Sequence, residues 1–142
     1  MQNKIVNMLL VEDDDIDAEG VRRAFSKQKL ANPLVRAKDG IEALEILRNQ
    51  HPDTSLSSPY ILLIDLNMPR MGGLELIQEI RKDPTLHKTV IFVLTTSKSE
   101  EDKLKAYDLN IAGFLIKSNL GENFIEMVNL LECYWKIVEL PS

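Results

Sequence analysis

Short aliphatic runs alternate along the chain with stretches in which apolar residues recur at helical spacing. The runs are Ile5–Val11, Leu34–Ala37, Tyr60–Ile64, Val90–Leu94 and Phe114–Ile116. Because their apolar positions follow one another and do not alternate with polar ones, they predict strands of a sheet that is covered on both faces.

The stretches between these runs have the period of amphipathic helices. One predicted helical face consists of Ile16, Val21, Ala24 and Phe25. Another consists of Leu104 and Tyr107. Asp39 followed by Glu42 fits a capping box at the start of a helix. Alternating strands and helices predict one α/β domain over residues 1–142, with a parallel sheet between two helical layers and a C-terminal helix extension at about 121–140.

Composition narrows the class of protein. The 142 residues include 17 basic and 22 acidic ones, for a net charge of −5, which disfavours binding to nucleic acid or to an anionic membrane. Apolar runs such as Ile61–Ile64 are far too short to span a bilayer, and no signal peptide is recognisable. Cys133 is the sole cysteine, which fits a reducing compartment. We therefore expect a cytoplasmic protein with protein partners.

Chemistry-bearing residues follow several of the predicted strands. They are Glu12–Asp15 after the first run, Asp65 and Asn67 after the third, Thr95–Ser97 after the fourth, and Lys117 after the fifth. Ligands of open α/β sheets bind beyond the carboxyl ends of the strands. The functional site is therefore predicted at this edge.

Three of these residues suit a metal ion. If the first and third strands are neighbours, the carboxylates of Glu12, Asp13 and Asp65 converge on one small volume and repel one another. A hard divalent cation relieves that repulsion, and oxygen ligands with room for water match Mg²⁺. Neither His nor Cys lies near these strand ends, which argues against zinc.

The same edge suits phosphoryl transfer. A carboxylate such as that of Asp65 can act as a nucleophile and form an acyl phosphate. The amine of Lys117 and the hydroxyl of Thr95 can then contact the phosphoryl oxygens. Each residue also has a structural interpretation, since Asp14 or Asp15 suits a helix N-cap and a lone strand-end Thr or Lys carries little information. Their joint placement favours the functional interpretation.

Four motifs resemble the signature of bacterial response-regulator receiver domains. They are LLVEDDD (Leu9–Asp15), LLIDLNMPRMGG (Leu62–Gly73), VLTTS (Val93–Ser97) and GFLIK (Gly113–Lys117). The resemblance covers essentially the whole chain. It implies a flavodoxin-like, doubly wound five-stranded sheet of order 2-1-3-4-5, and a two-component response regulator that takes its phosphoryl group from a sensor histidine kinase.

By this resemblance, Asp65 is the phospho-acceptor, with Thr95 and Lys117 as its catalytic partners. Mg²⁺ would be bound by the side chains of Asp13 and Asp65, by the backbone carbonyl of Asn67, and by Glu12 through a water molecule. The protein would not be an enzyme on other substrates, because it would catalyse only its own phosphorylation and autodephosphorylation.

The resemblance also predicts how phosphorylation changes the protein surface. Thr95 would move towards phosphorylated Asp65, and the ring of Phe114 would occupy the vacated space. The alternative is that Phe114 only packs in the core. Ser118 stands where the family usually has Pro after the lysine, which leaves the geometry of Lys117 open.

The C-terminal region suggests a subtype. The chain ends soon after its last predicted helix, so we expect no output domain. Loop 50–59 and the ending YWKIVELP resemble small regulators that partner bacterial phytochrome-type histidine kinases. The last helix has two adjacent apolar stripes, and one suffices to cover a sheet. The additional apolar surface includes Phe124, Tyr134, Trp135 and Ile137 and predicts a homodimer interface. The alternative is that the extension folds back over the domain.

Three other functions fit less well. A phosphohydrolase using Asp65 generally needs an acid two residues later, where Asn67 stands. A constitutive interaction module would not need the complete set of acids, hydroxyl and amine. A flavodoxin that binds FMN needs a first loop that accepts phosphate, and here that loop is acidic.

Overall fold

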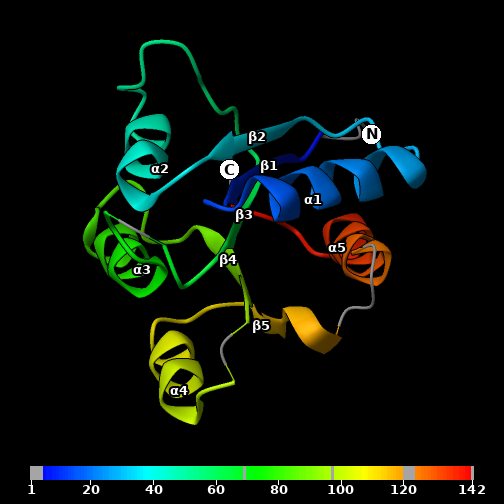
Figure 1. The fold of residues 1–142 in the computed structure, drawn as a ribbon. Coiled ribbons are helices and arrows are strands. Elements are labelled where there is room, and N and C mark those ends of the chain that lie inside the picture. The colour runs from blue at the N-terminus through cyan, green and yellow to red at the C-terminus, as the bar shows by residue number, and fades with distance from the viewer. Residues whose placement is uncertain (1–4, 69, 97, 120–123, 142) are drawn as a thin grey trace.

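A parallel sheet of five strands runs through the part of the chain that the computed structural model describes, residues 5–68, 70–96, 98–119 and 124–141 (Figure 1). The strands are β1 (Asn7–Val11), β2 (Leu34–Ala37), β3 (Tyr60–Ile64), β4 (Val90–Thr95) and β5 (Gly113–Ile116). The helices are α1 (Asp15–Lys27), α2 (Gly40–Leu47), α3 (Gly73–Lys82), α4 (Glu100–Asp108) and α5 (Ile125–Ile137), with a 3-10 turn, η1, at Lys117–Asn119. Strands and helices alternate as the sequence pattern predicts.

The strand order is β2-β1-β3-β4-β5, which confirms the order implied by the resemblance. In the register of the central strands, Val11 at the end of β1 pairs with Ala37 of β2 and with Ile64 of β3. The carboxyl ends of these three strands are therefore level. The residues that follow β1 and β3 consequently start from neighbouring points at one edge of the sheet.

Successive strand residues enter opposite cores, because side chains alternate between the two faces of a sheet. Leu9, Leu62 and Val93 are buried with side chains of α2 and α3. Met8, Leu63 and Phe92 are buried with those of α1 and α5. In Figure 1, α1 and α5 lie on one side of the sheet and α2 and α3 on the other. Both faces are covered, which explains why the strands lack polar alternation.

Acidic caps fix the starts of two helices. The side chain of Asp14 accepts hydrogen bonds from the backbone N–H groups of Ile16 at 2.8 Å and Asp17 at 3.1 Å, so Asp14 is the N-cap of α1. The side chain of Asp39 accepts from the N–H of Glu42 at 2.9 Å, as the capping box predicts. The reciprocal bond goes to Lys38 N–H instead, one residue before the cap.

Some apolar residues of the predicted helical faces lie in solvent. Ile16 is 82% exposed, because it occupies the first turn of α1 while Val21 and Ala24 are buried further along the helix. Leu104 and Tyr107 of α4 are also exposed. Within the described residues, every helix is too short or too polar to serve as a membrane span.

Candidate functional site

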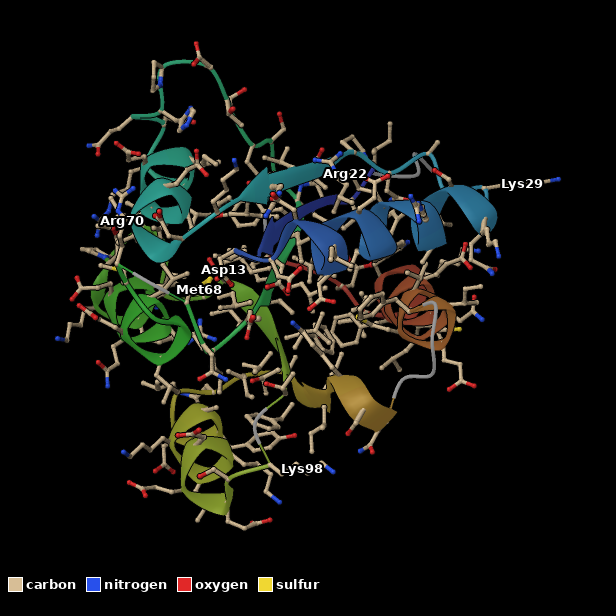
Figure 2. The ribbon with its side chains drawn as sticks, in the orientation of Figure 1. Asp13, Arg22, Lys29, Met68, Arg70 and Lys98 are labelled. Atoms are coloured by element: carbon tan, nitrogen blue, oxygen red, sulfur yellow. The ribbon has the colours of Figure 1, made fainter. Side chains whose placement is uncertain are left out.

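Three carboxylates meet at the carboxyl ends of β1 and β3. The backbone N–H of Asp65 bonds to the carbonyl of Val11 at 3.0 Å, so the ladder between the two strands continues into the loop residues. Oxygen atoms of Glu12, Asp13 and Asp65 all lie within 4.8 Å of one another. Figure 2 shows Asp13 at this end of the sheet, on the side where Met68 also lies. The convergence that the sequence predicted is present.

Burial makes this cluster electrostatically unfavourable by itself. Glu12 is only 1% exposed and Asp65 is buried, whereas Asp13 faces solvent. Burial raises the pKa of Glu12 to about 8, and the neighbouring Asp65 adds to the rise while Lys117 opposes it. A proton or a cation relieves the repulsion. Three carboxylates around one small volume, open to water through Asp13, fit a hard divalent cation.

Lys117, directly after β5, supplies the positive charge of the pocket. Its Nζ lies 2.8 Å from Glu12 Oε1 and 3.4 Å from Asp65 Oδ2. Burial alone would lower the pKa of Lys117, but hydrogen bonds with Asp17 and Glu12 and the charges of Glu12 and Asp65 outweigh it, so its pKa lies above the usual range. Lys117 therefore remains an ammonium group next to Asp65.

Asp17 is a member of the pocket that the sequence interpretation missed. Its Oδ2 lies 2.6 Å from Lys117 Nζ, the shortest of the three contacts that the ammonium makes with carboxylates. Asp17 lies in the first turn of α1, four residues after Asp13. Asp13 precedes the N-cap Asp14 and is not part of the helix, so no helical spacing links the two acids, and the sequence carries no signal that would have identified Asp17.

Arg36 on β2 is a second residue that the sequence interpretation missed. Its Nε donates to the backbone carbonyl of Glu12 at 3.0 Å, and its Nη1 contacts Asp15 Oδ1 at 2.7 Å. The guanidinium thus ties the β1–α1 loop to the neighbouring strand. It holds the backbone that carries the acidic pair.

Asn67 and the predicted hydroxyl of Thr95 also lie near Asp65. The N–H of Asn67 donates to Asp65 Oδ1 at 3.1 Å, and Asn67 Nδ2 donates to Thr95 Oγ1 at 3.5 Å. Thr95 is fully buried at the end of β4. Phe114 of β5 is half-buried and packs against the core cluster on the α2 and α3 side of the sheet.

The segment after Lys117 folds without the proline that the family usually has. Lys117, Ser118 and Asn119 form η1 directly after β5. Among the described peptide bonds, the cis one is Ser58–Pro59. Pro69 and Ser97, which belong to two of the sequence motifs, lie outside the described residues.

The predicted interface residues of the C-terminal helix fall into two groups. Tyr134 packs edge-on against Phe92 with ring centroids 5.1 Å apart, and Trp135 packs against Phe25 at 6.3 Å. Phe124 is likewise partly buried against the α1 and α5 core. Ile137, in contrast, is 82% exposed, so it is the predicted residue with the largest free apolar surface.

Comparison with known proteins places these features in a family. The sequence model of the response regulator receiver domain matches residues 8–129. The chain is 32% identical over 136 residues to the response regulator Rcp1 of Synechocystis sp., an alignment that covers 95% of this chain and 92% of Rcp1.

Solved structures agree with the sequence comparison. The phosphorylated cyanobacterial phytochrome response regulator RcpA is 33% identical, with a TM-score of 0.85 over 96% of this chain and 98% of that one. The Mn²⁺-bound form of Rcp1 is 31% identical, with a TM-score of 0.83 over 98% of this chain and all of the other, 100%. The bacteriophytochrome response regulator AtBRR is 29% identical, with a TM-score of 0.72 over 99% of each chain.

Proposed function

Since the chain belongs to the response regulator receiver domain family, we propose that it accepts a phosphoryl group on Asp65 in the presence of Mg²⁺ and thereby changes the surface that it offers to partners. The family places the protein in two-component signalling. The observation that carries the proposal is the pocket around Asp65, where its carboxylate lies 3.4 Å from the Lys117 ammonium and within 4.8 Å of the oxygens of Glu12 and Asp13.

The transfer itself needs one new bond and one broken bond. An Oδ atom of Asp65 bonds to the phosphorus atom as the phosphorus–nitrogen bond of a donor phosphohistidine breaks, and the electron pair of that bond returns to the imidazole nitrogen. Lys117 neutralises charge on the phosphoryl oxygens, and the hydroxyl group of Thr95 donates a hydrogen bond to one of them. In the reverse step a water oxygen bonds to the phosphorus atom as its bond to Asp65 Oδ breaks, which releases inorganic phosphate and restores the carboxylate. Both reactions would be catalysed by the chain itself.

Four groups would hold the cation. They are the side chains of Asp13 and Asp65, the backbone carbonyl of Asn67, and Glu12 through a water molecule. When Mg²⁺ is bound, the chemistry it supplies is the neutralisation of the carboxylates and of the phosphoryl oxygens. An oxygen-only ligand set favours Mg²⁺ over zinc, and the related Rcp1 has been crystallised with Mn²⁺, another hard cation.

The phosphoryl donor would be a sensor histidine kinase of the phytochrome type. Support comes from the relatives RcpA and AtBRR, which are described as phytochrome and bacteriophytochrome response regulators. Together with such a kinase, we propose a cytoplasmic location for the protein. Inside the chain, the signal would pass from Thr95 to the half-buried Phe114 and from there to the surface of α4, β5 and α5.

Incubation with acetyl phosphate and Mg²⁺ tests the function directly. We expect an intact-mass increase of one phosphoryl group, lost on treatment with hydroxylamine, which cleaves acyl phosphates. Peptide mapping should place the group on Asp65. A chain that stays unmodified at saturating Mg²⁺, or that carries the group on a hydroxyl, would overturn the proposal.

Asp13→Asn should weaken the cation site by about tenfold or more, since it removes one carboxylate ligand. The measurement is the rise in melting temperature with Mg²⁺ concentration, which reports binding to the folded state. Asp108→Asn, an exposed acid at the end of α4, removes the same charge away from the pocket and serves as the control. Equal Mg²⁺ responses in the two variants would exclude Asp13 as a ligand.

A homodimer through the C-terminal helix is the last part of the proposal. Because Tyr134 and Trp135 pack internally, Ile137 is the sharper test residue. Ile137→Asp should convert a dimer of the phosphorylated or unphosphorylated protein to a monomer in sedimentation velocity. Ile41→Asp, at a partly exposed position of α2, is the matched control. If the parent chain is monomeric in both states, this interface is wrong.

A further inference from the structure

The ammonium of Lys117 is already fully engaged before any phosphoryl group arrives. An ammonium group has three N–H donors. Three carboxylates surround it, at 2.6 Å for Asp17, 2.8 Å for Glu12 and 3.4 Å for Asp65. The residue that would be phosphorylated is therefore its most distant partner. A phosphoryl oxygen on Asp65 would be a fourth acceptor, so one existing contact has to weaken.

Among the two close partners, Asp17 is the one that can release the ammonium at lower cost. Its side chain is 29% exposed, so water can replace the ammonium as its hydrogen-bond partner. Glu12 is only 1% exposed, so water cannot take the place of the ammonium beside its Oε1 atom. Burial thus decides which contact yields when a new anion competes for Lys117.

The position of Asp17 is fixed by the start of α1. Its backbone N–H donates to Asp14 Oδ1, the side chain that caps the helix. The carboxylate of Asp17 therefore belongs to a rigid element on the side of the sheet that α1 covers. The contact links α1 to the end of β5, and it draws the ammonium towards α1 and away from Asp65.

We propose that Asp17 is a positioning residue that competes with the phosphoryl group for Lys117, and that its ion pair with Lys117 opens when Asp65 is phosphorylated. This inference rests on the proposed function of Asp65. In the unphosphorylated protein, the ammonium of Lys117 stays in the pocket, and its shortest ion pair is with Asp17. On phosphorylation, the N–H that pointed to Asp17 turns to a phosphoryl oxygen, and Asp17 becomes hydrated. Asp17 therefore sets the affinity of the pocket for an anion.

Binding of beryllofluoride, which mimics a phosphoryl group on an aspartate, tests this competition. At saturating Mg²⁺, calorimetric titration should give a dissociation constant about fivefold lower for Asp17→Asn than for the parent. Asp17→Ala should shift it in the same direction. A substitution that only damaged the pocket would weaken binding, so the direction of the shift separates positioning from loss of structure.

Glu19→Gln is the matched control, because it removes one acid from the same helix at a residue whose ion pair is with Arg23. Its dissociation constant should equal that of the parent. Asp17 variants that bind like Glu19→Gln, or more weakly than the parent, overturn the role of Asp17 while leaving the proposed function intact. If the parent protein does not bind beryllofluoride, both the proposed function and the role of Asp17 are overturned.

Discussion

Asp65→Asn should abolish phosphorylation by acetyl phosphate and by a kinase, because a carboxamide has no anionic oxygen with which to attack phosphorus. The expected loss is complete rather than partial. Glu12 is a poor substitute for Asp65, since it is 1% exposed and its Oε1 lies 2.8 Å from the Lys117 ammonium. The measurement is the intact mass of the protein after incubation with acetyl phosphate and Mg²⁺.

The same substitution should leave the fold intact and raise the stability of the cation-free protein. Asp65 is one of three carboxylates whose oxygens lie within 4.8 Å of one another, so its charge is repelled by its neighbours. Lys117 keeps its two closer partners when Asp65 is neutralised. We expect a higher melting temperature without Mg²⁺ and a smaller rise when Mg²⁺ is added. This pattern separates the loss of the nucleophile from misfolding.

Asp53→Asn, in the exposed loop between α2 and β3, provides the comparison, because it removes one acid at a distance from the pocket. It should be phosphorylated like the parent. Modification of Asp65→Asn to the parent level would place the phospho-acceptor elsewhere. A lower melting temperature of that variant without Mg²⁺ would contradict the repulsion between the three carboxylates.

The fold could be predicted from the sequence because its strands are continuously apolar and its helices are periodic. That pattern requires helices on both faces of a parallel sheet, which confines the site to the carboxyl edge. The convergence of Glu12, Asp13, Asp65 and Lys117 follows from the strand ends once it is known which strands are neighbours. Strand order, however, came from the family resemblance, since no residue pattern states which strands are neighbours.

Other features depend on side-chain reach, which spacing along the sequence does not encode. Asp17 and Arg36 enter the site from the first turn of α1 and from the neighbouring strand β2. In the sequence, each reads as an ordinary charged surface residue. The exposure of Ile16 and Leu104 was also not predictable from periodicity, because a helical face can extend beyond the sheet that it covers.

The charge balance of the pocket gives a physical reason for the proposed switch. In the described pocket, Lys117 contacts three acids, and Asp13 adds a fourth carboxylate. In such a site, the ammonium group stabilises several carboxylates and can exchange one of them for another anion. A phosphoryl group on Asp65 would add negative charge there and would compete for the ammonium and the cation. The elements that carry these groups, α1 and the end of β5, are the ones expected to respond.

Gly73→Ala should destabilise the protein by about 3 kcal/mol, because there is no space for a methyl group at this position. A Cβ on Gly73 would lie 2.5 Å from the carbonyl oxygen of Asp65 and 2.7 Å from Cα of Leu66. Both atoms belong to backbone, so neither can rotate away. The N–H of Gly73 also donates to the carbonyl of Leu66 at 3.0 Å, which fixes the start of α3 against this loop.

Relief of that clash requires α3 and the loop that carries Asp65 to separate. We therefore expect Gly73→Ala to lower both the free energy of unfolding, measured in urea, and the rate of phosphorylation by acetyl phosphate. Gly72→Ala is an adjacent control, since a Cβ there meets its nearest atom, the Leu66 carbonyl oxygen, at an ordinary 3.5 Å. If the two alanine variants unfold at the same urea concentration, the loop after β3 is not packed against α3 as tightly as these distances require.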